Sequence, residues 1–146
     1  MLQVRPAERD DSAAIARLCT QLGYPAQPSD IPARLAQLSD DPAVRALVAV
    51  DDGSVVGLIT THARHTMNHP APLAQITLLV VDETCRGRGI GRALVAAAED
   101  WARENGCKRI VVTTALRRAG AHAFYESVNY VHTGRRYGKD FAPGGH

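Results

Sequence analysis

The sequence predicts a mixed α/β domain, and three observations support this class. Apolar residues recur at helical spacing in two early segments. Later runs rich in valine, isoleucine and leucine are typical of strands, the most continuous being residues 76–81. The 146 residues are 45% hydrophobic and 22% charged, which suits one globular domain over residues 1–146.

The first third of the chain is expected to form a strand and two helices. Residues 2–5 are typical of a short strand. The first helix begins at the capping residues 10–12 and ends at Gly23. The second begins at residues 29–30 and ends at residues 40–42. Their apolar faces repeat with the period of a helix and comprise Ile15, Leu18, Cys19 and Leu22, then Ile31, Leu35 and Leu38.

Three strands are predicted next. Residues 44–50 and 54–67 are rich in β-formers, and the Asp-Asp-Gly turn at residues 51–53 joins them as a hairpin. A proline-containing loop follows at residues 68–72. Residues 73–82 then form a strand whose nearly continuous apolar run suits burial on both faces.

The last third is expected to alternate helices and strands. A helix begins near Ile90 and ends before Gly106, a strand covers residues 108–114, and a helix covers residues 119–128. One or two closing strands are expected within residues 130–141. The buried side of the first of these helices is predicted to contain Ile90, Leu94, Ala97, Ala98 and Trp101.

Composition excludes several classes of protein. The 17 Lys and Arg against 15 Asp and Glu, with only 5% aromatic residues, disfavour a nucleic-acid binder. No apolar run approaches the roughly 20 residues that span a membrane. Three cysteines without close pairing, and no apolar signal region in residues 1–7, predict a reduced, cytoplasmic protein.

The strongest motif is a glycine–arginine turn at residues 86–92, between a predicted strand and a predicted helix. Its glycines allow a ligand close to the backbone, and the first N–H groups of the helix carry partial positive charge. This combination predicts a site for a phosphate or pyrophosphate. Dinucleotide and P-loop patterns fail here, because Arg92 or Leu94 stands where the last glycine would be and no Gly-Lys-Ser/Thr follows. The alternative is a plain turn with solvated arginines.

Two motifs resemble those of the GNAT superfamily of N-acetyltransferases. Residues 79–91 resemble its central motif, in which an Arg or Gln and two small residues wrap the pyrophosphate of acetyl-CoA. Residues 121–130 resemble its A-x-x-F-Y-E-x-x-G-[FY] helix, with Asn129 in place of the glycine. Residues 22–25 resemble a bacterial aminoglycoside-acetyltransferase-like branch. The positions that match the central motif are Arg86, Gly89 and Gly91.

The resemblance implies a single-domain GNAT fold and acetyl-CoA as cosubstrate. Its mixed central sheet would splay between strands four and five, with helices on both faces. The positions implied for acetyl-CoA binding are the strand end Leu79, Val80 and Val81, the turn Arg86, Gly87, Arg88, Gly89, Ile90, Gly91 and Arg92, and the later Arg118 and His122. Arg118 replaces an Asn that the family often has there, so its contact is either a phosphate or solvent.

By the same resemblance Tyr125 is the general acid, although by itself it would be simply an aromatic anchor of its helix. A thiolate leaving group has a pKa near ~8.5 and a phenol near ~10, so the hydrogen bond helps more than full proton transfer. Gln75 stands where many relatives have a Glu, and an amide is not a base. The base is then a water chain, another residue such as His62 or His65, or none because the amine arrives neutral.

The expected reaction is transfer of acetyl to a primary amine of a small molecule, peptide or protein. The alternative is a non-catalytic acyl-CoA-binding module of the same fold. Candidate acceptor-binding residues are Tyr24, His62 and Gln75. Although His62, His65 and His69 are spaced like metal ligands, residues 62 and 65 of one strand point to opposite faces, so no metal is expected. Homodimers are common in the superfamily, which implies one here, whereas composition predicts no nucleic-acid or membrane partner.

Overall fold

Five strands form one mixed sheet in the computed structural model, which describes residues 1–113, 119–134 and 137–141. β1 to β4 are antiparallel to their neighbours, whereas β4 and β5 are parallel. The mixed α/β class is therefore confirmed. In spatial order the strands are β1 (Leu2–Pro6), β2 (Val44–Asp51), β3 (Ser54–Arg64), β4 (Leu73–Val81) and β5 (Arg109–Val112).

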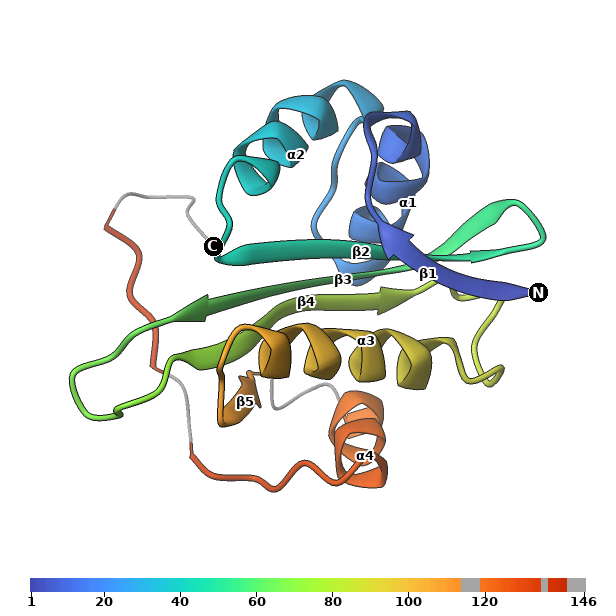
Figure 1. Cartoon of the computed structure of the whole chain (residues 1–146). Helices are drawn as coiled ribbons and strands as arrows, with labels where there is room; N and C mark the ends of the chain where they lie inside the picture. The colour runs from blue at the N-terminus through green and yellow to red at the C-terminus, as the bar shows by residue number, and fades with distance from the viewer. Residues whose placement is uncertain (114–118, 135–136, 142–146) are drawn as a thin grey trace. The chain divides into compact units, whose positions relative to one another are not determined.

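Helices cover both faces of this sheet. The helices α1 (Ser12–Leu22) and α2 (Ile31–Ser39) lie on one face, which we name the α1–α2 face, and α3 (Ile90–Glu104) lies on the other, the α3 face (Figure 1). All these elements belong to one compact unit, Met1–Val112. A second unit, Thr113–His146, contains α4 (Ala119–Ser127) and is described by itself.

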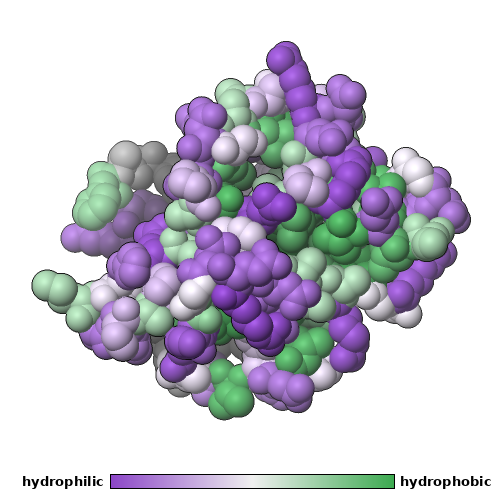
Figure 2. All heavy atoms as spheres, viewed as in Figure 1, coloured by the Kyte–Doolittle hydropathy of each residue, from purple (hydrophilic) through white to green (hydrophobic). Residues whose placement is uncertain are grey.

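The core on the α1–α2 face follows from the apolar stripes of the two helices. The buried cluster joins these stripes to side chains in one row of the sheet, where Val48 pairs with Leu58 and Leu58 with Val80. Mostly hydrophilic side chains cover the outer side of α1 and α2 at the top of Figure 2, as amphipathic helices require. The buried helix residues are Ile15, Ala16, Leu18, Cys19, Ile31 and Leu35.

On the α3 face, close packing depends on Gly57 of β3. A Cβ at this position would lie 2.9 Å from Leu94 Cδ1 and 3.1 Å from Ile90 Cγ2. Such distances are below those of ordinary contacts, so α3 approaches β3 at a place where only glycine fits. Because Ile90 is the first residue of α3, this contact also positions the start of the helix.

Some predicted boundaries are wrong. The strand predicted for residues 54–67 ends at Arg64, because its last partner on β4 is Leu73, the first residue of that strand. The strand predicted for residues 108–114 covers only Arg109–Val112. The described residues 128–134 and 137–141 contain no strand, and glycines at 134 and 138 disfavour one there. Within the described ranges, none of the helices has the length and apolar content needed to cross a membrane.

Candidate functional site

The turn between β4 and α3 leaves the start of the helix open. Gly87 and Gly89 adopt the left-handed conformation, with φ of 85° and 78°. Gly89 is the N-cap of α3 and has no side chain with which to cap it, and the first helical turn contains no acidic residue. The N–H groups and positive end of α3 are therefore available to an anion.

The surroundings of this turn suit the same ligand. The side chains of Arg86, Arg88 and Arg92 are exposed, and among the described residues no carboxylate forms an ion pair with them. In the part of the chain that the structure describes, no atom lies within 4 Å of a Cβ built on Gly87 or Gly89, so these residues leave the space above both glycines open. A pyrophosphate fits this combination of charge, free donors and room.

Asp82 anchors the beginning of the turn, a role that the sequence analysis missed. Its Oδ1 accepts hydrogen bonds from Thr84 N (3.0 Å) and Thr84 Oγ1 (2.7 Å). From α1, Arg17 Nε approaches Asp82 Oδ2 at 3.3 Å, and Gln21 Oε1 accepts from Glu83 N at 3.0 Å. The hydrogen bonds from Thr84, first from its backbone, hold the pKa of Asp82 below its usual value. Arg17 and Gln21 are one turn apart on α1, but nothing in the sequence connects them to a residue some 65 positions away.

A fork opens between β4 and β5. The paired residues end at Ile76 and Val112, whereas β4 continues through Val81. At the fork Thr77 is a bulge, because Thr60 pairs with Leu78 and Thr61 with Ile76. Thr77 Oγ1 donates to the Thr60 carbonyl (3.1 Å) and lies 2.6 Å from Thr60 Oγ1, which holds the bulge in place.

The strand beyond the fork contains the three residues expected to line the cosubstrate. The side chain of Val80 is buried among α1 and α2, so only its backbone is available. Leu79 and Val81 are half-buried. Among the described strands, none pairs with this part of β4 on its β5 side, which leaves backbone groups of this edge for a ligand.

Two of the three candidate acceptor residues lie together on the α1–α2 face. His62 pairs with Gln75 in the β3–β4 register, next to the fork. Arg64 Nε donates to His62 Nδ1 at 3.2 Å, so the proton of the neutral imidazole is on Nε2. Burial, and then the charge of Arg64, lower the pKa of His62, whereas Asp41 opposes this shift. Tyr24 lies beyond the end of α1 and is half exposed.

The remaining candidates belong to the second unit or to loops. Tyr125 is buried in the second unit, and its ring lies 5.3 Å from the ring of Phe124 and 5.6 Å from that of Tyr130. Arg118 and the side chain of His122 lie outside the described residues. His65 and His69 are exposed in the loop after β3. In the described part of the chain, no three or more His, Cys, Asp or Glu side chains are placed to hold a metal ion.

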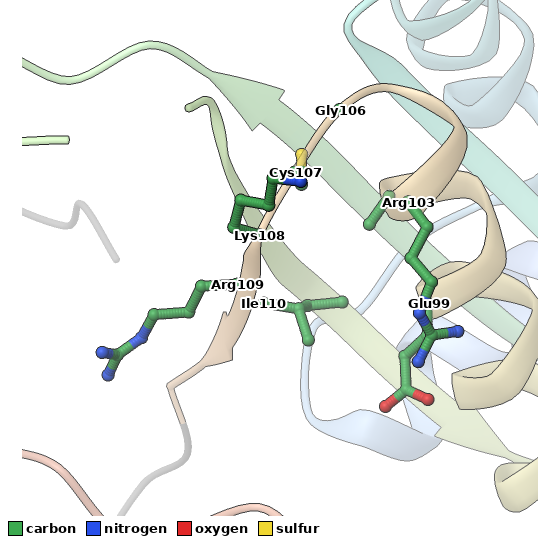
Figure 3. A pocket seen from close by; sticks show the side chains of 8 residues that line it. Glu99, Arg103, Gly106, Cys107, Lys108, Arg109 and Ile110 are labelled. Carbon is green, nitrogen blue, oxygen red and sulfur yellow. The ribbon is translucent and has the colours of Figure 1, made fainter. Parts of the chain in front are cut away.

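A pocket of about 410 Å³ lies at the opposite end of α3 (Figure 3). α3 has 15 residues, so this pocket is roughly 22 Å along the helix from the glycine-rich turn. Its Arg103 forms an ion pair with Asp100. The pocket is therefore separate from the glycine-rich turn. Its lining residues are Glu99, Ala102, Arg103, Gly106, Cys107, Lys108, Arg109 and Ile110.

Comparison with known proteins gives matches over most of the chain. A family model described as the acetyltransferase (GNAT) family matches residues 12–130. The aminoalkylphosphonate N-acetyltransferase of Salmonella typhimurium is 32% identical, over 94% of this chain and 90% of the relative. The aminoglycoside N(6')-acetyltransferase type 1 of Stenotrophomonas maltophilia is 29% identical, over 90% and 88%. The solved aminoglycoside N-acetyltransferase AAC(6')-Iy in complex with CoA has the same fold, with a TM-score of 0.85, 18% identity and coverage of 97% and 96%.

Proposed function

The chain belongs to the GNAT family of acetyltransferases, and on this premise we propose that it transfers acetyl from acetyl-CoA to the primary amine of a small molecule. The observation that carries the cosubstrate assignment is the uncapped, acid-free start of α3 behind two left-handed glycines. A helix start of this kind favours a pyrophosphate. The names of the two relatives, an aminoalkylphosphonate and an aminoglycoside acetyltransferase, support a small-molecule acceptor.

The binding residues follow from the turn and the free edge of β4. The N–H groups from Gly87 to Gly91 and the side chains of Arg86, Arg88 and Arg92 would hold the phosphates. Backbone groups of Leu79, Val80 and Val81 would hold the extended arm of the cosubstrate. Thr77 lies five residues before Asp82, about 17 Å along the strand. An arm that follows β4 from the turn over this length would have its reactive end at the fork.

The proposed chemistry needs a proton donor and a neutral amine. When bound, acetyl-CoA supplies an activated thioester. Tyr125 would place its phenolic hydrogen at the departing sulfur, as the family motif implies, with Arg118 and His122 near the cosubstrate. Gln75 has no basic group, whereas His62 beside it has a lowered pKa and is neutral at pH 7. Its Nδ1 accepts from Arg64 and its Nε2 bears the proton, so neither nitrogen is free to take the proton of the amine. A water chain would then take this proton, or the amine would bind in its neutral form.

The test combines cosubstrate binding with turnover. Thermal melting of the full chain is compared without ligand and with acetyl-CoA, CoA, NADH or ATP. A ligand at a hundredfold excess over its Kd stabilises the folded state by about 2.7 kcal/mol. We expect stabilisation by acetyl-CoA and CoA and release of free thiol with an amine. Stabilisation without turnover on a broad amine panel would instead support the non-catalytic acyl-CoA-binding module, and no stabilisation would overturn the cosubstrate assignment.

The proposal also includes the wider expectations of a homodimer and a cytoplasmic location. Light scattering at several protein concentrations tests the first. A monomeric mass throughout would remove the dimer from the proposal.

A further inference from the structure

Two arginines share one row and one face of the sheet. Leu73 of β4 pairs with Arg64 of β3 on one side and with Arg109 of β5 on the other. Paired residues point to the same face, so both arginines flank Leu73 on one face. Ile110 points toward α3 and Arg109 points away from it (Figure 3), which identifies the shared face as the α1–α2 face. We call Arg64, Leu73 and Arg109 the arginine row.

The two cations of the row have no acidic partner in the described part of the chain. Both side chains are exposed, and no carboxylate of a described residue forms an ion pair with either guanidinium. Adjacent strands are about 4.8 Å apart, so the two Cα atoms are roughly 10 Å apart. Guanidinium groups on side chains of this length can therefore converge on one anion between them.

The side chain of Arg64 is held toward the neighbouring pair of residues, His62 and Gln75, by a hydrogen bond. Its Nε donates to His62 Nδ1 at 3.2 Å, and His62 pairs with Gln75. This leaves the two terminal nitrogens of the guanidinium for an acceptor beside Gln75. The contact also restricts the side chain in advance, which reduces the entropy lost on binding.

The arginine row lies close to the fork. Leu73 is two residues from Gln75 along β4, about 7 Å, and Gln75 is two residues from the bulge at Thr77. If the thioester lies at the fork, the amine that attacks it must bind there too. An anionic group separated from that amine by a few carbon–carbon bonds of the acceptor would then reach the arginine row.

From these observations we propose that Arg64 and Arg109 bind an anionic group of the acceptor, so the substrate is a short-chain amine bearing a phosphonate, phosphate or carboxylate. This inference rests on the proposed acetyl transfer and deepens it by naming the acceptor class. Planar guanidinium groups bind oxyanions through paired hydrogen bonds. A polycationic acceptor would be repelled by the same two charges, which favours an anionic amine over an aminoglycoside.

The test compares acceptors and variants in the full chain. The acceptors are 2-aminoethylphosphonate, β-alanine, propylamine and kanamycin. The variants are Arg64→Ala, Arg109→Ala and the control Arg45→Ala, an exposed arginine of β2 whose partner Thr61 lies on the α3 face. We expect kcat/KM to be highest for the phosphonate or the carboxylate. Each arginine-row variant should lower it about tenfold to a hundredfold for these two acceptors only, and Arg45→Ala should not.

The outcomes separate this inference from the proposed function. The ratio between 2-aminoethylphosphonate and β-alanine identifies the anion. If kcat/KM for propylamine or kanamycin equals that for the anionic acceptors, the proposed anion site is wrong. It is also wrong if the variants lower kcat/KM equally for all acceptors. Neither result contradicts acetyl transfer. If no acceptor is acetylated, the proposal of acetyl transfer fails. Calorimetry with 2-aminoethylphosphonate on the CoA-loaded protein then tests whether the arginine row binds an anion. Binding that Arg64→Ala abolishes supports it, and no binding overturns it.

Discussion

Arg17 Nε lies 3.3 Å from Asp82 Oδ2, a contact that joins α1 to the residue at which the glycine-rich turn begins. Asp82 is buried and also accepts two hydrogen bonds from Thr84. Asp82→Ala leaves these donors without their acceptor. We therefore expect a loss of about 1–3 kcal/mol in the free energy of unfolding, measured in urea, and weaker acetyl-CoA binding by calorimetry.

Arg17→Ala is the matched control for this prediction. Half of the Arg17 side chain is exposed, and exposed ion pairs contribute about 0–1 kcal/mol. The loss in unfolding free energy should thus be smaller than for Asp82→Ala. Equal losses in the two variants would show that the ion pair, rather than the hydrogen bonds from Thr84, anchors the turn.

The stability of the protein should fall in acid because of Asp11 and Asp82. The hydrogen bond from Arg5 is the largest cause of a lowered pKa in Asp11, and the backbone hydrogen bond from Thr84 is the largest in Asp82. A carboxyl whose pKa is lower in the folded state stabilises it above the unfolded pKa, near ~3.9. This stabilisation is lost as the pH falls through the folded pKa. The unfolding free energy should therefore decrease from about pH 5 downward.

Asp11→Asn tests the acid prediction, because it retains an oxygen that accepts from Glu8 N but cannot titrate. The variant should be less stable than the wild type at pH 7 and lose less stability between pH 5 and 3, as measured by urea unfolding at each pH. Parallel curves for the two proteins would mean that Asp11 does not contribute to the acid dependence.

Local sequence patterns predicted the helices well. The ends of the strands and the side chains that meet across the sheet depend on long-range pairing, which local patterns do not show. The stripe with Ile15 and Leu18 repeats within one segment, so the sequence alone shows which side of α1 is buried. The end of β3 depends on where β4 begins, and no local signal marks Arg64 as the last residue. For the same reason the sequence did not predict the arginine row. Arg64 and Arg109 share a row only because both pair with Leu73, in a register that the sequence does not show.

Gly57 should tolerate no side chain. The Cβ of Gly57→Ala would lie 2.9 Å from Leu94 Cδ1 and 3.3 Å from the Val80 carbonyl oxygen. Overpacking of a core typically costs about 1–3 kcal/mol, and we expect this loss in urea unfolding. In the background of Leu94→Ala, which removes the closest atom, Gly57→Ala should cost less. A cost unchanged by Leu94→Ala would mean that the backbone of β4 causes the clash.

Gly89 and Gly53 allow backbone strain to be separated from ligand binding. Their φ values are 78° and 82°, and no atom of the described residues lies within 4 Å of a Cβ at either position. Alanine at each should therefore lower the unfolding free energy by about 1 kcal/mol. Only Gly89→Ala places a methyl group at the open start of α3, so it alone should weaken acetyl-CoA binding in calorimetry, by roughly tenfold. Equal affinity in both variants would remove Gly89 from the proposed site.

Tyr125→Phe tests the proposed proton donor while keeping the ring. The variant retains the contacts of this ring with Phe124 and Tyr130, which do not need the hydroxyl. General acid catalysis contributes about a hundredfold or more, and kcat should fall by this order with little change in acetyl-CoA affinity. Tyr130→Phe, which removes the hydroxyl of the neighbouring ring, should keep kcat. If kcat of Tyr125→Phe equals that of the wild type, Tyr125 serves only in packing, and the proton reaches the leaving thiolate from another group or from water.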